Sequence, residues 1–202
     1  MNCARHLPEA WITGVDIHPY RTGEFAEGAD ERRRCAWTRK DPVLAAYHDD
    51  EYGFPLTRDE DLLERLVLEI NQAGLSWLTV LKKRKALREA FDGFDVDRVA
   101  AYDDEDRSRL LGDTGIIRNR LKIDAAIHNA RVVQEIRRNH GSFVAWLNGQ
   151  TCASLDEWVA VFRKTFRFMG PEIVGEFLMS TGYLPILHDP ECFLAGEGHR
   201  VG

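Results

Sequence analysis

The sequence has no apolar run long enough to cross a membrane, few cysteines and no excess of basic residues. A membrane-spanning helix needs ~20 consecutive apolar residues, and no stretch of this chain approaches that length. Four cysteines in 202 residues are too few for the dense pattern of a disulfide-stapled secreted domain. The start of the chain also lacks the apolar segment of a signal peptide. We therefore expect a protein of a reducing, cytoplasmic setting with no membrane partner.

The charge balance excludes a strongly basic protein but leaves room for local contacts with nucleic acid. Twenty-seven basic and 33 acidic residues give a formal net charge of −6. Nucleic-acid binding depends on where the basic side chains lie, and these cluster at 82–88, 118–122 and 163–167. A single basic face is therefore compatible with the acidic total.

Alternating strand patterns and internal repeats are absent as well. Apolar residues recur at helical spacing through most of the chain, which predicts an all-α fold. Residues 1–33 are irregular in spacing and are expected to form an N-terminal extension. Residues 34–193 would form the helical domain, and 194–202 an irregular tail.

Local signals mark several helix ends. Thr57–Glu60 and Ser154–Glu157 have the spacing of capping boxes, and Ser76 can cap a further helix. Pro171 suits the first turn of the last helix. Gly112–Gly115 predicts a turn between two helices, at about 105–111 and 118–138.

Two Cys/His pairs lie near the two ends of the predicted domain. The pairs are Cys35 with His48 and His188 with Cys192. Two Cys and two His can form a closed tetrahedral zinc site, which would be structural because it leaves no position for substrate. The spacing also allows the alternative of two buried cysteines and two unrelated histidines.

Glu69 falls at the edge of the apolar stripe of the predicted helix after Thr57. A carboxylate there is costly unless it is paired or faces a polar cavity. One interpretation is an ion pair with Arg65, one turn earlier. The alternative is a functional pocket.

A helix–loop–helix corner and several flat rings favour the pocket. The corner covers Asn71–Trp77, and the rings belong to Trp37, Tyr47, Tyr52 and Trp77. Rings on both sides of a base and a hydrogen-bond acceptor are what a flipped nucleobase requires. Each ring taken singly is also explained by core packing.

The Gly-bounded turn at 112–115 is followed by Arg118, Arg120 and Lys122. Backbone N–H groups at such a helix start can bind a phosphate without reading sequence. A plain connection between two helices is the simpler alternative.

Taken together, these residues resemble the 3-methyladenine DNA glycosylase I family, within the helix-hairpin-helix glycosylase superfamily. The resemblance spans about residues 34–193. The motifs that carry it are Cys35–Trp37, Asp41–Pro42, Ala46–Asp49, Tyr52–Pro55, Glu69, Gln72–Trp77, Leu81–Arg84, Gly115–Arg118 and His188 with Cys192.

The resemblance implies a fold, a metal and a base pocket. Its structural zinc would be bound by Cys35, His48, His188 and Cys192, joining the N- and C-terminal segments of an all-helical domain. The pocket residues would be Glu69, which hydrogen-bonds the methylated adenine, Tyr47 as a polar partner, Trp77 as the stacking ring, and Trp37 and Tyr52 in the wall.

The resemblance further implies a partner and a reaction. The enzyme would hydrolyse the N-glycosidic bond of 3-methyladenine in alkylated double-stranded DNA. Its DNA contacts would be made by Gln72, Gly74 and Leu75 at the corner and by Gly115 and Arg118 in the hairpin. A monomer is the default expectation.

Two departures from the family pattern bear on base selectivity. Tyr52 stands where the family usually has Trp, and Ile70–Asn71 replaces a smaller pair beside Glu69. Ile70 either narrows the pocket or packs behind it. A catalytically silent damaged-DNA or nucleobase-binding protein of the same fold, and a zinc hydrolase, are the alternatives from other classes.

Overall fold

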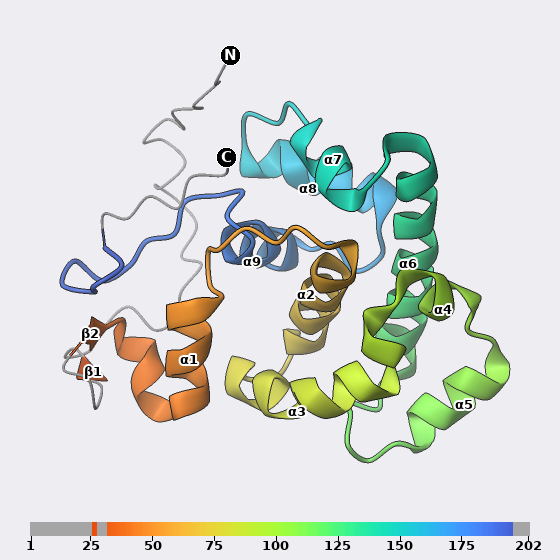
Figure 1. The fold of residues 1–202 in the computed structure, drawn as a ribbon, viewed down its shortest axis with the longest axis horizontal. Helices are drawn as coiled ribbons and strands as arrows, with labels where there is room; N and C mark the ends of the chain where they lie inside the picture. Colours follow the sequence, from red (N-terminus) through yellow and green to blue (C-terminus); the bar gives the residue numbers. More distant parts are fainter. Residues whose placement is uncertain (1–25, 28–31, 196–202) are drawn as a thin grey trace.

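The computed structural model describes residues 26–27 and 32–195, and the fold is all-α as predicted (Figure 1). The helices follow one another along the described part of the chain. They are η2 (Ala36–Lys40), α1 (Pro42–Asp50), α2 (Asp59–Gln72), α3 (Trp77–Ala90), η3 (Asp92–Phe94), α4 (Val96–Ala101), α5 (Asp104–Gly112), α6 (Arg120–His140), α7 (Phe143–Asn148), α8 (Leu155–Thr165) and α9 (Pro171–Ser180). Within these residues, no helix is long and apolar enough to span a membrane.

One antiparallel pairing of two-residue strands was not predicted. β1 (Ala26–Glu27) pairs with β2 (Arg33–Arg34), with Ala26 opposite Arg34. Strands this short carry no alternation that a sequence pattern could reveal. Of the expected extension at 1–33, residues 1–25 and 28–31 lie outside the described residues, as do residues 196–202 of the expected tail at 194–202. The domain boundaries at 33/34 and 193/194 stay predictions.

Side-chain caps set most of the predicted helix starts. Ser76 accepts a hydrogen bond from the backbone N–H of Thr79, and Ser154 accepts one from that of Glu157. The expected reciprocal bond of the second box goes elsewhere, because the Glu157 carboxylate accepts from the N–H of Ala153. Pro171 occupies the first turn of α9, as predicted.

The predicted capping box at Thr57 is wrong. α2 begins at Asp59, and its N-cap, Arg58, makes no side-chain cap. The Asp59 carboxylate accepts hydrogen bonds from the N–H of Phe143 and from Arg137, and Glu60 also accepts from Arg137. Contacts with α6 and α7 therefore set this helix start, and such contacts have no local signature.

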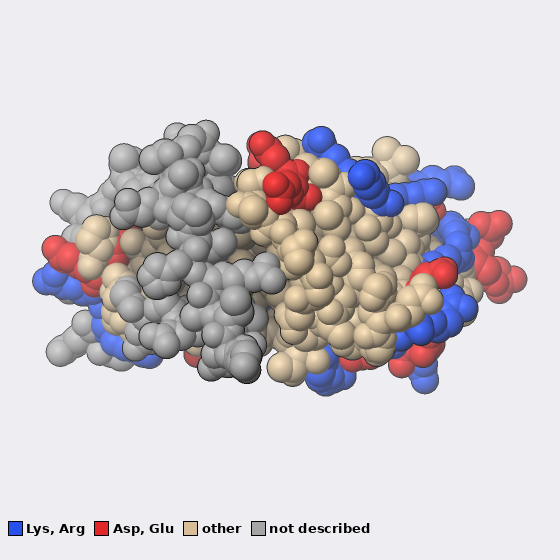
Figure 2. Space-filling model, turned by 90° about the horizontal axis from the view of Figure 1, so that it is seen from above, with Lys and Arg blue, Asp and Glu red and all other residues tan. Residues whose placement is uncertain are grey.

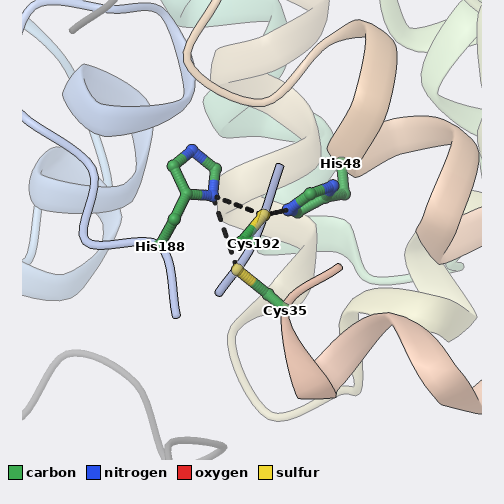
Figure 3. Close-up of side chains that lie close together, drawn as sticks. All are labelled: Cys35, His48, His188 and Cys192. Atoms are coloured by element: carbon green, nitrogen blue, oxygen red, sulfur yellow. Dashed lines mark hydrogen bonds between the residues drawn. The ribbon is translucent and has the colours of Figure 1, made fainter. Parts of the chain in front are cut away.

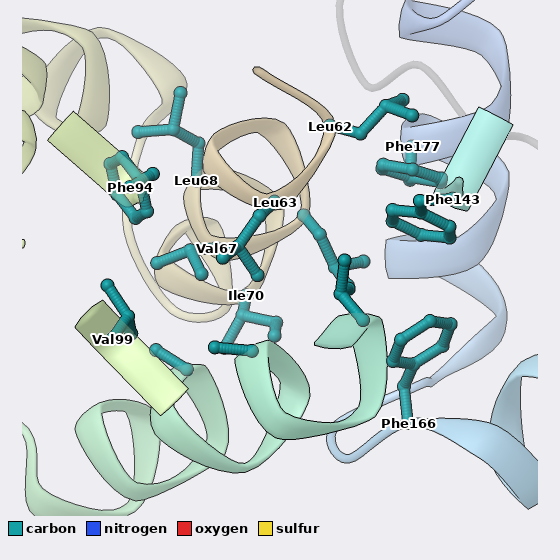
Figure 4. Close-up of a cluster of buried hydrophobic side chains, with 14 of the residues drawn as sticks. Leu62, Leu63, Val67, Leu68, Ile70, Phe94, Val99, Phe143, Phe166 and Phe177 are labelled. Carbon is teal, nitrogen blue, oxygen red and sulfur yellow. The ribbon is translucent and has the colours of Figure 1, made fainter. Parts of the chain in front are cut away.

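Helix α2 runs through the centre of the domain. Every residue from 62 to 71 is buried, so the helix has no exposed face over these three turns. Figure 4 shows α2 between Phe94 and Val99 on one side and three phenylalanines on the other: Phe143, Phe166 and Phe177. A polar side chain on this part of α2 must therefore find its partners inside the protein.

The two ends of the domain meet beside α1. The backbone N–H of Phe193 donates to the carbonyl of Arg33, and Cys35, Cys192 and Leu194 form a small buried cluster. On another side of the molecule, around α7 and α8, Figure 2 shows a broad uncharged area with basic and acidic side chains mixed along its margin. That face carries no continuous basic stripe in its described part.

Candidate functional site

The four predicted metal ligands come together where the two ends of the described domain meet (Figure 3). Cys35 Sγ lies 3.4 Å from His188 Nδ1, and Cys192 Sγ lies 3.4 Å from His48 Nε2 and 3.8 Å from His188 Nδ1. All four ligand atoms lie within 4.8 Å of one another. A tetrahedral zinc site with the usual Zn–S and Zn–N lengths would place its ligands about 3.3–3.8 Å apart. The donor set and its spacing therefore fit one zinc ion.

Surrounding contacts prepare these side chains as ligands. His48 Nδ1 lies 2.8 Å from Asp49, whose carboxylate is gripped by Arg34 at 2.8 and 3.0 Å from Nε. This bond directs His48 Nε2 toward Cys192, in the manner of the carboxylate–histidine pairs of zinc sites. Burial lowers the pKa of His48, which keeps the imidazole neutral and able to bind a metal.

Cys35 needs a nearby cation to become a thiolate here. Burial raises the pKa of the Cys35 thiol, and the nearby Cys192 raises it further. The N–H of Asp189 points at Cys35 Sγ from 3.3 Å, and the Asp189 carboxylate accepts from the N–H of Ala36 at 2.7 Å. Hydrogen bonds therefore hold the segment at Cys35–Ala36 against the segment at His188–Asp189 without a metal.

Glu69 is almost fully buried, with 3% of its surface exposed. Its Oε1 accepts one long hydrogen bond, from Ser180 Oγ at 3.4 Å. The ion pair with Arg65 that the sequence allowed is absent among the described contacts, although the guanidinium lies near enough to lower the pKa of Glu69. Burial dominates and, together with the charge of Glu176, raises that pKa to about 8. The carboxyl group is therefore largely protonated at pH 7 in the free protein.

The predicted rings gather beside Glu69. Tyr47 lies at the centre, 5.1 Å from the Trp77 ring, 5.8 Å from Tyr52 and 6.5 Å from Trp37. Tyr47 and Tyr52 are buried, whereas Trp37 and Trp77 are partly exposed. The Trp77 indole Nε1 is buried without a hydrogen-bond partner in the described part of the chain. The site therefore has an aromatic wall, one side of which reaches solvent.

Trp37 lies between this aromatic wall and the cluster of Cys35, His48, His188 and Cys192 (the Cys/His cluster). Its ring lies 5.5 Å from His48 and 5.8 Å from Tyr52, edge to face in both cases. Tyr47 and His48 are also neighbours on α1. Any shift of the Cys/His cluster would move the aromatic wall with it.

Arg65 positions Tyr47, a role that sequence reasoning missed. Its guanidinium donates to Tyr47 Oη at 2.9 Å, to the carbonyl of Ser180 at 3.3 Å and to Glu51 at 3.0 Å. Because the Tyr47 oxygen accepts this bond, its own O–H remains able to donate into the site. No local sequence pattern indicates this role, because Arg65 and Tyr47 lie on different helices and meet only in the folded structure.

Glu176 is a second carboxylate that sequence reasoning missed. It lies on α9, half-buried, and its Oε2 accepts a long hydrogen bond from Tyr52 Oη at 3.5 Å. Burial raises its pKa to about 7. A glutamate in the otherwise apolar run Ile173–Met179 was the available signal.

Ile70 and Asn71, which depart from the family pattern, are both buried. Ile70 belongs to the main hydrophobic core (Figure 4). Asn71 donates its side-chain N–H to the carbonyl of Val67 at 2.8 Å. Both residues serve the packing of α2.

The corner after α2 is exposed and held in place from below. Gly74 has φ +80°, which suits glycine, and Leu75 is 40% exposed. The buried Lys122 ammonium donates to the carbonyls of Asn71 and Ala73 at 2.9 and 2.7 Å. These bonds fix the corner to the start of α6, directly after the hairpin.

The hairpin connects α5 to α6 as predicted, but one of its amides is already engaged. The N–H of Gly115 donates to Asp113 Oδ1 at 2.7 Å, whereas those of Ile117 and Arg118 have no partner in the described part of the chain. The Arg118 side chain is exposed. Lys83 holds the turn by donating to the carbonyl of Gly115 at 2.9 Å.

Part of the basic stretch 82–88 is engaged in ion pairs with the protein's own carboxylates. Lys82 pairs with Asp41 at 2.6 Å, and Arg84 binds Glu51 and Glu64. Arg88 also binds Glu64.

The fold and this constellation define a helical domain with an acidic, aromatic-walled site next to an exposed loop. A sequence model of the methyladenine glycosylase family matches residues 37–160. DNA-3-methyladenine glycosylase 1 of Escherichia coli K12 is 40% identical over 168 residues, which cover 74% of this chain and 90% of that protein. The chain therefore belongs to the methyladenine glycosylase family.

Solved structures agree. A crystal structure of 3-methyladenine DNA glycosylase I (TAG) superposes with a TM-score of 0.73 at 40% identity, covering 80% of this chain and 99% of the other. TAG from Staphylococcus aureus, solved to explain its recognition of 3-methyladenine, gives 0.69 at 30% identity, covering 84% and 98%.

The raised pKa of Glu69 predicts how stability depends on pH. The folded state keeps a proton to about pH 8, whereas the unfolded chain releases it near pH 4.5, so this group's stabilising contribution is complete below pH 4.5 and lost as pH rises through 8. Glu69→Gln should reduce the loss of unfolding free energy between pH 5 and pH 8 by roughly 2–4 kcal/mol.

Denaturant unfolding at a series of pH values measures this effect. The exposed Glu89→Gln variant is the control and should follow the wild type. Parallel pH profiles for the wild type and Glu69→Gln would contradict the buried, protonated state of Glu69.

Proposed function

We propose that this protein is a DNA glycosylase that flips 3-methyladenine out of alkylated double-stranded DNA and hydrolyses its N-glycosidic bond. The observation that carries the proposal is the buried Glu69 carboxyl group under an aromatic wall, next to an exposed corner. Membership of the methyladenine glycosylase family supports it, as do relatives named for this activity.

The substrate's charge explains why little acid catalysis is needed. A methyl group on N3 leaves the adenine of DNA positively charged. When the bond from C1′ to N9 breaks, its electron pair goes to the base, which leaves neutral. The oxygen of a water molecule then bonds C1′, and one proton of that water is released. The protein's task is to select the cation, extract it and hold it.

Glu69 suits this selection because the positive base offsets its burial. The ring's charge favours the ionised carboxylate in a site where the carboxyl group is otherwise protonated. The carboxylate then accepts a hydrogen bond from the exocyclic amine of the base. A neutral adenine lacks the charge and must still be unstacked, at a cost of a few kcal/mol. Glu69 is thus a recognition group and not a nucleophile.

The aromatic side chains supply the remaining contacts. Trp77 stacks on the base, and a ring binds a cation more strongly than a neutral partner. The Tyr47 O–H, left free by the bond from Arg65, donates to an acceptor on the base. Trp37 and Tyr52 line the wall.

The DNA contacts follow from what is exposed near the site. Leu75, flanked by Gln72 and Gly74, enters the duplex where the base leaves it. The hairpin, in the manner of a helix-hairpin-helix motif, contacts backbone phosphate through the free amides of Ile117 and Arg118 and the Arg118 guanidinium. Lys122 keeps the two elements in register. We assign the protein to the bacterial cytoplasm, with its DNA substrate, and expect it to act as a monomer.

One structural zinc ion completes the site. Cys35, His48, His188 and Cys192 would bind it through two sulfurs and two nitrogens, with no position left for substrate or a reactive water. Its role is to join the chain ends and to hold Trp37 and α1 in place. This closed ligand set speaks against a zinc hydrolase.

Base release from methylated duplex DNA tests the activity. The wild type should release 3-methyladenine, identified by mass, and Glu69→Ala should release it at least ~100-fold more slowly because the carboxylate that stabilises the cation is gone. Glu89→Ala, exposed on α3, is the control. A folded wild type that binds the methylated duplex without releasing base would instead support the catalytically silent binding protein.

Removal of the metal tests the structural role of the Cys/His cluster. Chelation under non-denaturing conditions should lower the melting temperature by more than 5 °C, about 2 kcal/mol for a domain of this size. Cys35→Ala should reproduce the loss, whereas Cys152→Ala, outside the cluster, should not. Complete metal removal with unchanged melting would contradict the assignment.

A further inference from the structure

The second carboxylate, Glu176, faces Glu69 across the site. Glu176 and Ser180 are one helical turn apart on α9, so they share a face of that helix. Ser180 Oγ lies 3.4 Å from Glu69 Oε1, which turns this face toward α2. Glu176 itself binds Tyr52, a ring of the aromatic wall. Two independent contacts thus direct Glu176 into the base site.

Neither carboxyl group has a full partner inside the protein. Among the described residues, Glu176 has one hydrogen bond, at 3.5 Å, and Glu69 has one, at 3.4 Å, and neither has an ion pair within 4 Å. Arg65, a nearby cation, is engaged by Tyr47, the Ser180 carbonyl and Glu51. Most buried carboxylates are paired or bound by several donors. Two carboxyl groups without full partners lower the stability of the fold, and a positively charged ligand can offset that cost.

We propose that Glu176 is a second base-recognition residue, which forms with Glu69 a dicarboxylate site for purines that carry a fixed positive charge. This inference rests on the proposed function and narrows its substrate class. The site would accept cationic N-alkylated purines and reject neutral bases of the same shape.

The physical basis is the repulsion between two like charges in a buried site. Two carboxylates close together do not both ionise readily, and each raises the pKa of its neighbour. A cation between α2 and α9 removes that repulsion, because both groups can then face a positive ring. A neutral base does nothing to relieve it, so the second carboxylate increases the preference for charge. Tyr52 Oη, which donates to Glu176, keeps that carboxylate turned toward the wall.

A residue with this role has a distinctive signature on substitution. Glu176→Gln keeps the shape and can still accept a hydrogen bond, but it removes the negative charge. The fold should become no less stable, because a poorly partnered, half-buried carboxyl group is lost. Cation recognition should weaken at the same time. A purely structural residue would lose stability and activity together.

The test compares the wild type, Glu176→Gln and the control Glu172→Gln, which changes an exposed glutamate one turn earlier on α9. Two small probes differ in charge and in one methyl group: 3,9-dimethyladeninium, which is positively charged, and 9-methyladenine, which is neutral. Each probe is compared between the wild type and the variants, so the difference in shape cancels. Binding is measured by quenching of tryptophan fluorescence, melting temperature by calorimetry, and release of 3-methyladenine by single-turnover kinetics on methylated duplex.

Glu176→Gln should bind the cationic probe at least 10-fold more weakly, bind the neutral probe as the wild type does, melt at the same or a higher temperature, and release 3-methyladenine at least 10-fold more slowly. Glu172→Gln should match the wild type throughout. Equal weakening for both probes, unchanged binding of the cation, or a lower melting temperature in proportion to lost activity would overturn the proposal.

The two proposals can fail separately. If the wild type releases no 3-methyladenine, the proposed reaction fails, and the probe comparison still decides whether Glu176 selects cations. If the wild type releases the base and Glu176→Gln does so equally well, the reaction stands and the role of Glu176 falls.

Discussion

A carboxyl group buried in the central helix is the constraint on which the rest of the site depends. Glu69 lies on α2, which is covered on all sides, and only one long hydrogen bond reaches it. Only 3% of the Glu69 surface is exposed, so an ionised Glu69 carboxylate is costly until a positive charge lies beside it. We propose that the base binds at this point, where the protein accepts a cost to its stability, as functional sites commonly do.

The surrounding contacts keep this expensive arrangement in place. The Cys/His cluster brings residues from both ends of the domain together beside α1, and the Trp37 ring lies 5.5 Å from His48 and 5.8 Å from Tyr52 in the aromatic wall. Arg65 donates hydrogen bonds to Tyr47 and to the Ser180 carbonyl, and among the described contacts it forms no ion pair with Glu69. Lys122 attaches the exposed corner to α6. Each contact holds one wall of the site and leaves the carboxyl group free.

Features set by neighbouring residues were predictable from the sequence, and features set by distant ones were not. Helical periodicity and the caps at Ser76 and Ser154 depend on a few adjacent positions, and the all-α fold followed from them. The resemblance marked Glu69 and the four Cys/His residues. The start of α2 depends on Arg137, about eighty residues away, and the contact of Glu69 with Ser180 depends on how α9 packs against α2. Neither contact leaves a local pattern.

If the site works as proposed, the buried Glu69 carboxyl group releases its proton when a positively charged base binds. Infrared difference spectroscopy at pH 7, on protein with isotope-labelled glutamate, observes that change directly. On addition of 3,9-dimethyladeninium, the account predicts loss of a protonated carboxyl band and gain of a carboxylate band, both missing in Glu69→Gln. A bound wild type whose carboxyl bands do not change, or a change that persists in Glu69→Gln, would contradict it.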